Sequence, residues 1–486
     1  MTCLAERERV VDVLSIIKTR VNVEDSNAQA GTAAPPSVIL ASVYRRLTPG
    51  NEVRDACGGA LRRLPGPLDY AVSRYACSRC ERDERRMIKT MDLTRCTPSE
   101  ALESDRPRIV LTPDSFKGSL SAPDVARSMS IGIRRVLPGA DIVELPIADG
   151  GEGTIDALLS AGGIEHQVTV RSARGVSKSA RIAVLPDGTG VVEIAEIVGI
   201  TDGDGMAVSL GERTTLGVGD AILALLDMGV NRIHVGLGGS STSDAGAGML
   251  VALGVSLTDF QGNVVEPLPD RLGRVAHVDV SGLDSRLDGT EIILLCDVDN
   301  PLTGPNGAAA IFGAQKGGTP EQLATIDDAI SRYANLLERS IGISAAQKHG
   351  AGAAGGLGFA LLLLGASAKN GATVVLEAQQ FGEALCGADW HLTGEGRSDL
   401  QSLRGKAPAI AAMLASDAGV PSTLISGSID PDALPALAQR FAGCFSIAPG
   451  PVSLEFAIEN AAVFIANTTE QATRLRFTGC RHMSRS

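Results

Sequence analysis

The sequence has no run of about 20 apolar residues, the length that a membrane-spanning helix needs. The longest uncharged candidate, 349–368, contains six glycines in its 20 positions, so we interpret it as a glycine loop that leads into a buried helix. The first 20 residues carry seven charged side chains, which is unlike a secretory signal. These absences predict a protein that has no membrane partner and is not secreted.

Paired cysteines and an excess of positive charge are also missing. The nine cysteines are scattered and odd in number, which does not suit a disulfide framework, so we expect a reducing, cytoplasmic environment. The formal net charge of −12 argues against nucleic acid as a partner. It does not argue against small anionic substrates, because a few N–H groups and one lysine can bind phosphate within an acidic protein.

Several familiar catalytic signatures are absent as well. Gly405-Lys406 is followed by alanine, whereas a Walker loop needs serine or threonine there. The dinucleotide fingerprint that would start at Gly236 has Ser241 where its last glycine should stand. There is no H-E-x-x-H sequence, and the loops contain no good match to the G-x-S-x-G nucleophile elbow. The sequence therefore matches none of these common nucleotide-binding or hydrolase motifs.

Residues 1–106 differ in composition from the rest of the chain. Their net charge is +2, so the remainder carries −14, and they contain five of the nine cysteines. No alternation of strands and helices is visible, so we predict a poorly ordered extension. Cys77 and Cys80 have the spacing of a zinc half-site, but no second pair follows. We further predict that translation begins near Met87 or Met91, which the mass of protein made from the native gene would test.

Beyond residue 107 the pattern becomes strand, glycine-rich loop and helix. The clearest example is 231–253, in which an apolar stretch, a loop that starts at Gly236 and an apolar helix follow one another. Glycines allow positive φ and a close approach to a ligand, and the N–H groups at a helix start favour an anion. The loop is therefore a candidate phosphate site, although a tight turn with a serine N-cap would have the same pattern.

Similar loops follow four other predicted strands, at 109–111, 142–147, 292–296 and 389–392. They carry carboxylates, glycines and an occasional lysine or arginine. Because open α/β sheets bind ligands at the carboxyl ends of parallel strands, we expect these loops to meet in one cleft. Such a cleft suits phosphoryl transfer, which needs positioning and charge neutralisation more than covalent chemistry. For each loop alone, a solvated turn is the alternative.

A different pattern begins near residue 165. Alternating apolar stretches on both sides of the turn Pro186-Asp187-Gly188 predict antiparallel strands. We therefore expect a second domain inserted into the first. The predicted organisation is an extension at 1–106, a discontinuous α/β domain at 107–164 and 289–475, an inserted α/β domain at 165–288, and a tail at 476–486.

Six motifs follow one another in a recognisable order. They are PDSFKGSLSA (113–122), LPIADGGEGT (145–154), GLGGSSTSDAGAGM (236–249), CDVDNPLTGPNGAAAIFGAQKG (296–317), GAGAAGGLGF (350–359) and TGEGRSDLQSLRGKAP (393–408). Together they resemble the bacterial glycerate kinase family of the first type. The resemblance implies a two-domain, open parallel-sheet (Rossmann- or flavodoxin-like) α/β fold with an inserted mixed α/β domain and a cleft between the two. It also implies transfer of phosphate from ATP, with Mg²⁺, to D-glycerate, most often giving 2-phosphoglycerate.

The resemblance also implies site residues, motif by motif. The catalytic group is Lys117, Asp244, Asp297, Glu395, Arg397 and Asp399. The group that binds glycerate or ATP is Asp114, Ser115, Asp149, Gly150, Gly151, Glu152, Gly238, Gly239, Ser240, Asn300 and Lys406. The expected Mg²⁺ ligands are Asp149, Asp297 and Asp399. The sequence does not decide which carboxylate is the general base.

Two departures from the family pattern concern fine detail. Ser241-Thr242-Ser243 stands where the family more often has Ala-Thr-Asn, and Leu400 stands where glycine is common. A related small hydroxy acid as the substrate, 3-phosphoglycerate as the product, and a homodimer all stay open. A nicotinamide-dependent oxidoreductase and a non-catalytic regulator are the competing classes, and ADP release that depends on D-glycerate would separate them from a kinase.

Overall fold

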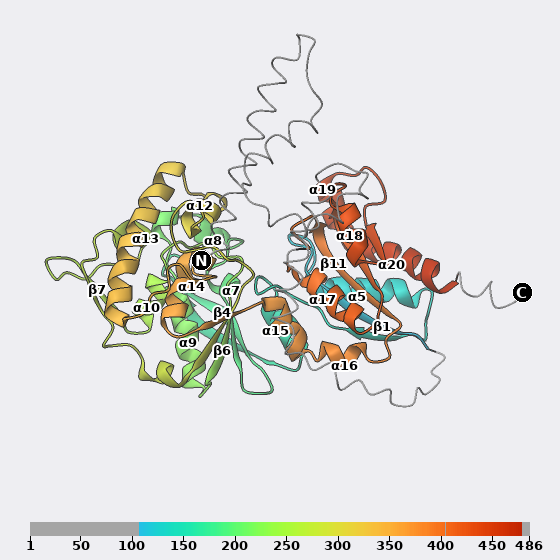
Figure 1. Cartoon of the computed structure of the whole chain (residues 1–486), viewed down its shortest axis with the longest axis horizontal. Coiled ribbons are helices and arrows are strands. Elements are labelled where there is room, and N and C mark those ends of the chain that lie inside the picture. The colour runs from blue at the N-terminus through green and yellow to red at the C-terminus, as the bar shows by residue number, and fades with distance from the viewer. Residues whose placement is uncertain (1–105, 404, 479–486) are drawn as a thin grey trace, which may run out of the picture. The chain divides into compact units, whose positions relative to one another are not determined.

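The computed structural model describes residues 106–403 and 405–478 (Figure 1). The predicted extension at 1–106, its cysteine pair and the two candidate start sites fall almost wholly outside the described residues. Within the described part, two sheets carry the fold. No helix in the described ranges is long and apolar enough to cross a membrane.

The first sheet has five strands, all parallel, in the order β13-β12-β11-β1-β2. The strands are β1 (Arg108–Pro113), β2 (Asp141–Glu144), β11 (Trp390–Ser398), β12 (Ser422–Ile429) and β13 (Gly443–Ser446). Counted in chain order, this is the 2-1-3-4-5 arrangement of flavodoxin-like sheets. The predicted open parallel-sheet fold is confirmed.

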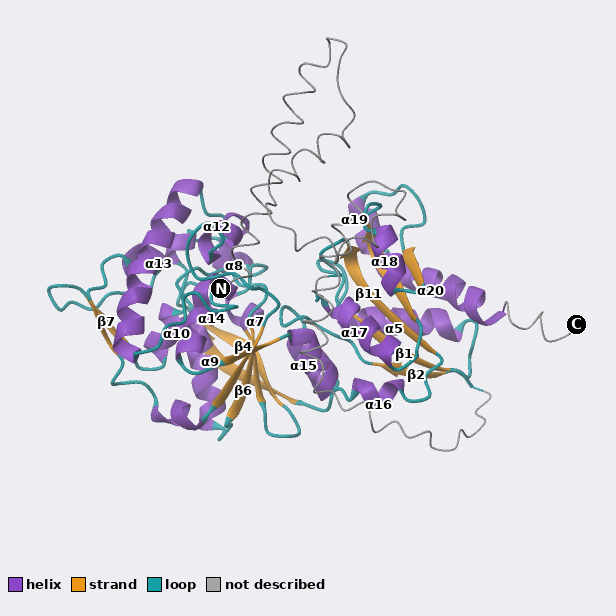
Figure 2. Ribbon diagram, in the orientation of Figure 1, coloured by secondary structure: helices purple, strands orange, loops and turns teal. Residues whose placement is uncertain are grey.

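Helices cover both faces of this sheet (Figure 2). Ile109 and Leu111 of β1 pack with α5 (Ala122–Arg134) and α20 (Ala461–Thr478). Val110 points the opposite way and packs with α6 (Thr154–Leu159), α15 (Gly371–Ala378) and α17 (Ala407–Asp417). This alternation explains why β1 is apolar at successive positions, since both faces of a parallel sheet are buried. Ser121 caps α5 by accepting a hydrogen bond from the Asp124 N–H, as its position before Pro123 predicts.

The second sheet has six strands in the order β10-β9-β6-β5-β4-β3. The strands are β3 (Ile164–Arg171), β4 (Ser177–Val184), β5 (Gly190–Glu193), β6 (Arg232–Gly236), β9 (Glu291–Leu295) and β10 (Ser367–Lys369). The pairs β3/β4 and β4/β5 are antiparallel, as the turn at 186–188 predicts, and the pairs from β5 to β10 are parallel. A separate hairpin joins β7 (Ser256–Thr258) and β8 (His277–Asp279).

The remaining elements connect these strands. They are α6 (Thr154–Leu159), α7 (Ile194–Val198), α8 (Gly203–Met206), η3 (Leu210–Glu212), α9 (Leu216–Asp227), α10 (Ala247–Ala252), α11 (Pro269–Leu272), η4 (Ser285–Gly289), α12 (Ala308–Phe312), η5 (Ala314–Lys316), α13 (Pro320–Ile341), α14 (Ala353–Leu363), α15 (Gly371–Ala378), α16 (Phe381–Leu385), α17 (Ala407–Asp417), α18 (Leu434–Arg440) and α19 (Leu454–Glu459).

Two expected boundaries are wrong. β9 pairs with β6 and β10 pairs with β9, so the chain does not return to the first sheet near residue 289 but stays with the second sheet through Lys369. The apolar run of β9 is typical of a buried parallel strand, which it is, but sequence does not tell which sheet such a strand joins. The tail expected at 476–486 also begins too early, because α20 continues through Thr478.

Candidate active site

One part of the site lies where β1 and β11 meet. These neighbouring strands lead to helices that connect in opposite directions across the sheet, which makes their carboxyl ends the topological switch point. The N–H of Asp114 donates to the carbonyl of Gly394 at 2.8 Å, so Asp114 and Glu395 lie at adjacent positions. Open α/β sheets bind their ligands at this location.

Lys117 follows β1 and faces the loop after β2. Its Nζ lies 3.9 Å from the Asp149 Oδ2, and its side chain is 66% exposed. The negative charge of Asp149 raises the pKa of Lys117, with further contributions from Asp114, Asp297 and Glu152 that outweigh desolvation. Lys117 is therefore a charged ammonium surrounded by carboxylates and open to solvent, which suits it to bind an incoming anion.

Asp114 is a buried carboxyl beside this lysine. Burial and the nearby Asp149 charge raise the pKa of Asp114 to about 8, while Lys117 acts to lower it. The Ser115 N–H donates to the Asp114 Oδ1 at 2.6 Å. The Ser115 Oγ is buried and has no hydrogen-bond partner within the described residues. The Asp114 and Ser115 side chains therefore retain unused hydrogen-bonding capacity next to Lys117.

Asp297 and Lys406 complete the charged cluster. Desolvation and the Asp149 carboxylate raise the pKa of Asp297, and Lys117 and Lys406 lower it. The Lys406 Nζ also lies 3.6 Å from the Glu395 Oε2, whose side chain is 8% exposed. Lys406 precedes α17, and Asp297 follows β9, so loops from both sheets supply this charge.

Two glycine segments hold the loops of the two sheets together. A Cβ on Gly238 would lie 2.4 Å from the Gly151 Cα, and a Cβ on Gly150 would lie 2.5 Å from the Leu295 carbonyl oxygen. Gly150 also has φ +94°, and its carbonyl accepts from the Gly238 N–H at 3.0 Å. Glycine is needed at both places because any side chain would separate the backbones.

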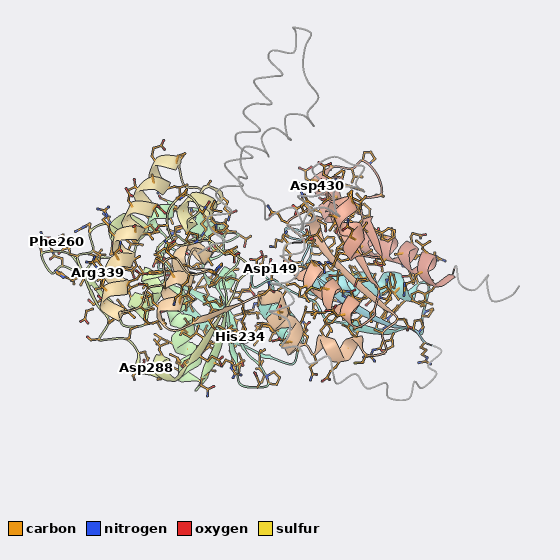
Figure 3. All side chains as sticks on the ribbon, viewed as in Figure 1. Asp149, His234, Phe260, Asp288, Arg339 and Asp430 are labelled. Carbon is orange, nitrogen blue, oxygen red and sulfur yellow. The ribbon has the colours of Figure 1, made fainter. Side chains whose placement is uncertain are left out.

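A pocket of about 460 Å³ lies over these segments. Its lining includes Lys117, Asp149, Gly151, Glu152, Gly238, Gly239, Ser240, Asp297 and Lys316. The loop that carries Asp149 can be located in Figure 3, where this residue is labelled. In the described part of the chain, the N–H groups of Gly239 and Ser240 have no protein acceptor, so two donors remain for a ligand at the pocket wall.

Buried cations hold the carbonyl groups of the same loop. The Lys316 Nζ donates to the Thr242 carbonyl at 2.7 Å and to the Ser240 Oγ at 2.9 Å. The Arg213 Nη1 donates to the carbonyls of Ser241 and Lys316 at 3.1 and 2.9 Å. The Ser241 and Thr242 carbonyls of the loop are thus used internally, whereas the Thr242 and Ser243 hydroxyls are buried without a hydrogen-bond partner among the described residues.

Asp244 was expected in the catalytic group, but it lies away from the pocket. Its carboxylate is fully buried and accepts hydrogen bonds from the Thr215 N–H and hydroxyl and from the N–H groups of Gly246 and Gly248, at 2.7 to 3.1 Å. It does not line the pocket. Its contacts are those of a residue that anchors the glycine loop to the start of α9.

Three other predicted residues are also away from the pocket. The Nη2 of the exposed Arg397 lies 3.9 Å from the Oδ2 of Asp430, which follows β12 and is labelled in Figure 3. The Asp399 carboxylate accepts from the backbone N–H groups of Gln401 and Ser402 and so closes its own turn. The Asn300 amide donates to the Asn306 carbonyl. The expected loop at 393–399 is also shorter, since β11 continues through Ser398.

Comparison with known proteins decides the family. The model of the glycerate kinase family matches residues 109–476. The chain belongs to the glycerate kinase family. Glycerate kinase from Bacillus subtilis is 44% identical over 370 residues, covering 74% of this chain and 95% of that protein, and glycerate 2-kinase from Escherichia coli is 39% identical, covering 67% and 86%. A crystal structure of a Salmonella typhimurium LT2 protein assigned as glycerate kinase 2 has a TM-score of 0.68 and 38% identity, and it covers 78% of this chain and all of that one.

The carboxylates of this kinase suit a metal that arrives with its substrate. Among the described residues, no group of three or more side chains from His, Cys, Asp and Glu is arranged to hold an ion. Mg²⁺ commonly takes only one or two carboxylates, with phosphate oxygens and waters as its other ligands. Asp149 and Asp297 both line the pocket and raise the local negative charge, so they fit such an ion, whereas Asp399 does not.

Sequence reasoning missed the buried cations of this kinase. Lys316 lies within the fourth motif but received no role, and Arg213 lies outside all six motifs. Lys316 stands between Gln315 and Gly317 after a short apolar helix, which is equally typical of an exposed turn. Only its 2% exposure and its contacts distinguish it.

Proposed function

We propose that the protein transfers the γ-phosphoryl group of ATP to D-glycerate and forms 2-phospho-D-glycerate. The observation that carries this proposal is the pocket itself, in which free N–H groups of a glycine loop, an exposed lysine and two carboxylates converge. The position of the product phosphate is suggested by the Escherichia coli relative, which is named a 2-kinase.

We assign the polyphosphate to the glycine loop. The Gly239 and Ser240 N–H groups would donate to phosphate oxygens, and Lys117 would neutralise charge on the transferred group. Asp149 and Asp297 would hold Mg²⁺, which supplies charge neutralisation for the phosphates when bound. The roles of these residues are binding and orientation, which account for most of the catalysis of phosphoryl transfer.

We assign the glycerate to the switch point of the five-stranded sheet. Lys406 would pair with the glycerate carboxylate, and the unused Ser115 hydroxyl would contact a substrate hydroxyl. Asp114 would accept the proton of the attacking hydroxyl, because it lies beside Lys117 and its raised pKa of about 8 gives it useful basicity near neutral pH.

The test is a coupled assay of ADP release with Mg-ATP and D-glycerate, followed by phosphorus NMR of the product. We expect ADP release that requires both D-glycerate and Mg²⁺, with the product phosphorus coupled to a single proton, as on carbon 2. Coupling to two protons would place the phosphate on carbon 3. ATP binding without turnover of glycerate would overturn the substrate assignment in favour of another small hydroxy acid.

A further inference from the structure

Lys316 is a buried lysine at the wall of the nucleotide pocket. It ends η5, is 2% exposed, and contributes to the same lining as Gly239 and Ser240. Within the described residues its ammonium has no carboxylate within ion-pair distance, and its hydrogen-bond partners are the Ser240 hydroxyl and the Thr242 carbonyl. A buried charge without a counter-ion is costly, and a neutral side chain would fill the same space at lower cost. Packing alone therefore does not explain a lysine at this position.

The hydrogen-bond direction at Ser240 provides that reason. A lysine ammonium has three donors and no acceptor, so the Ser240 Oγ can only accept from it. The hydroxyl proton of Ser240 must then point elsewhere. The Ser240 Oγ has no second partner among the described residues, and Ser240 lines the pocket, so the pocket is the available direction. A neutral amine would lose this control, because it could accept the proton from Ser240.

We propose that Lys316 is a positioning residue for phosphoryl transfer, which acts through Ser240 by turning its hydroxyl into a donor toward a phosphate oxygen of the bound nucleotide. The inference rests on the proposed function of the pocket as the ATP site. Lys316 itself need not touch the nucleotide.

Arg213 supports the same arrangement from the interior. It donates to the Lys316 carbonyl and to the Ser241 carbonyl, so the two cations together hold the carbonyls of residues 241 and 242 away from the pocket. The N–H groups of Gly239 and Ser240 are left for phosphate, with positive charge directly behind them. Burial, together with the charge of Arg213, lowers the pKa of Lys316 to about 7, against the opposing effect of Asp244. An anion in the pocket would favour the charged amine and so the donating form of Ser240.

The test compares Lys316→Met, Ser240→Ala and the double variant. The affinity for Mg-ATP is measured by calorimetry in the absence of acceptor, and kcat and KM are measured with D-glycerate. We expect each single variant to weaken ATP binding and kcat/KM for ATP by at least about 10-fold, the loss of a charge-assisted hydrogen bond. The double variant should be little worse than either single one, and KM for glycerate should stay within about 2-fold. Lys348→Met, at an exposed lysine outside the nucleotide pocket, is the matched control and should behave as wild type.

A pH profile distinguishes a positioning role of Lys316 from a purely structural role. In wild type, the affinity for Mg-ATP measured without acceptor should decline above about pH 7 as Lys316 loses its proton, and this decline should be absent in both single variants. Ser240→Ala keeps the Lys316 bond to Thr242, so it tests the idea even if Lys316→Met does not fold. Additive effects of the two substitutions, or wild-type ATP affinity in Ser240→Ala, would overturn the inference. Failure of wild type to bind ATP would instead overturn the proposed function on which it rests.

Discussion

Gly238 and Gly151 contact each other backbone to backbone. A Cβ on Gly238 would lie 2.4 Å from the Gly151 Cα and 3.0 Å from its nitrogen. Gly151 belongs to the loop after β2 of the parallel sheet, and Gly238 to the loop after β6 of the mixed sheet. The contact therefore determines how closely the Asp149 carboxylate approaches the N–H groups of the glycine loop.

Gly238→Ala should lower kcat by about 100-fold, because the added methyl group must push the two loops apart and a displacement of about 1 Å is costly in a catalytic site. Steady-state kinetics and a thermal unfolding curve would show whether the loss is catalytic or a loss of folded protein. Gly450→Ala is the control, since a Cβ there meets no atom within 4 Å. Wild-type kinetics in Gly238→Ala would show that the contact does not position the site.

Lys117→Met should lower kcat/KM for ATP by about 100- to 1,000-fold, since it removes the exposed positive charge that we assign to the transferred phosphate. Lys117→Arg should recover part of the activity, because it restores charge with a different shape. The raised pKa of Lys117 keeps it protonated throughout the neutral range, so the loss of affinity for Mg-ATP, measured without acceptor, should be the same at pH 6 and pH 9. A defect confined to high pH would contradict this role.

Asp149→Asn and Asp297→Asn should each raise the Mg²⁺ concentration needed for half-maximal rate by about 10-fold or more, because Mg²⁺ depends on few carboxylates. Asp399→Asn is the comparison, and it should leave the Mg²⁺ requirement unchanged, since that carboxylate is occupied by its own turn. Titration of the rate with MgCl₂ at a constant ATP concentration gives the measurement. If Asp399→Asn shifts the titration as strongly as Asp149→Asn, the expected role of Asp399 as a ligand is restored.

Asp244→Asn should reduce the free energy of unfolding by about 3 kcal/mol, because an amide nitrogen would replace an acceptor among buried N–H donors. The folded fraction should keep its KM for ATP and glycerate. Urea denaturation measures the first effect and kinetics the second, with the exposed Asp417→Asn as control. A variant of unchanged stability that has lost kcat would mean that Asp244 takes part in the reaction.

We expect the buried His391 to make the stability of the protein depend on pH. It is fully buried between the Thr112 and Ser422 hydroxyls, and burial lowers its pKa from 6.5 to about 3. The unfolded chain therefore takes up the proton first as the pH falls, so stability is fully present above about pH 6.5 and is lost toward pH 3. The slope of unfolding free energy against pH should be smaller in His391→Gln by about 1.4 kcal/mol per pH unit between pH 6 and pH 4. Equal slopes in the two proteins would refute the assignment.

Local sequence determined much of this protein. The strands, the caps and most helices follow from apolar periodicity and turn residues, which act over a few positions. The helix over 320–341 is an example, since it begins at Pro320 after the capping Thr319 and ends before Gly342 with φ +80°. The six motifs likewise identified the family, because each motif keeps its residues in one short segment.

Tertiary structure decided the rest, for a physical reason that Asp244 and Lys316 illustrate. In the sequence, Asp244 is an acid beside glycines, which suggests catalysis, and Lys316 is a lysine beside a turn, which suggests exposure. Whether a carboxylate faces a ligand or internal N–H donors depends on which distant backbone packs against it, here the Thr215 segment. The same is true of β9, whose apolar side chains would suit either sheet but which pairs with β6. Long-range packing sets these partners, and no short segment encodes it alone.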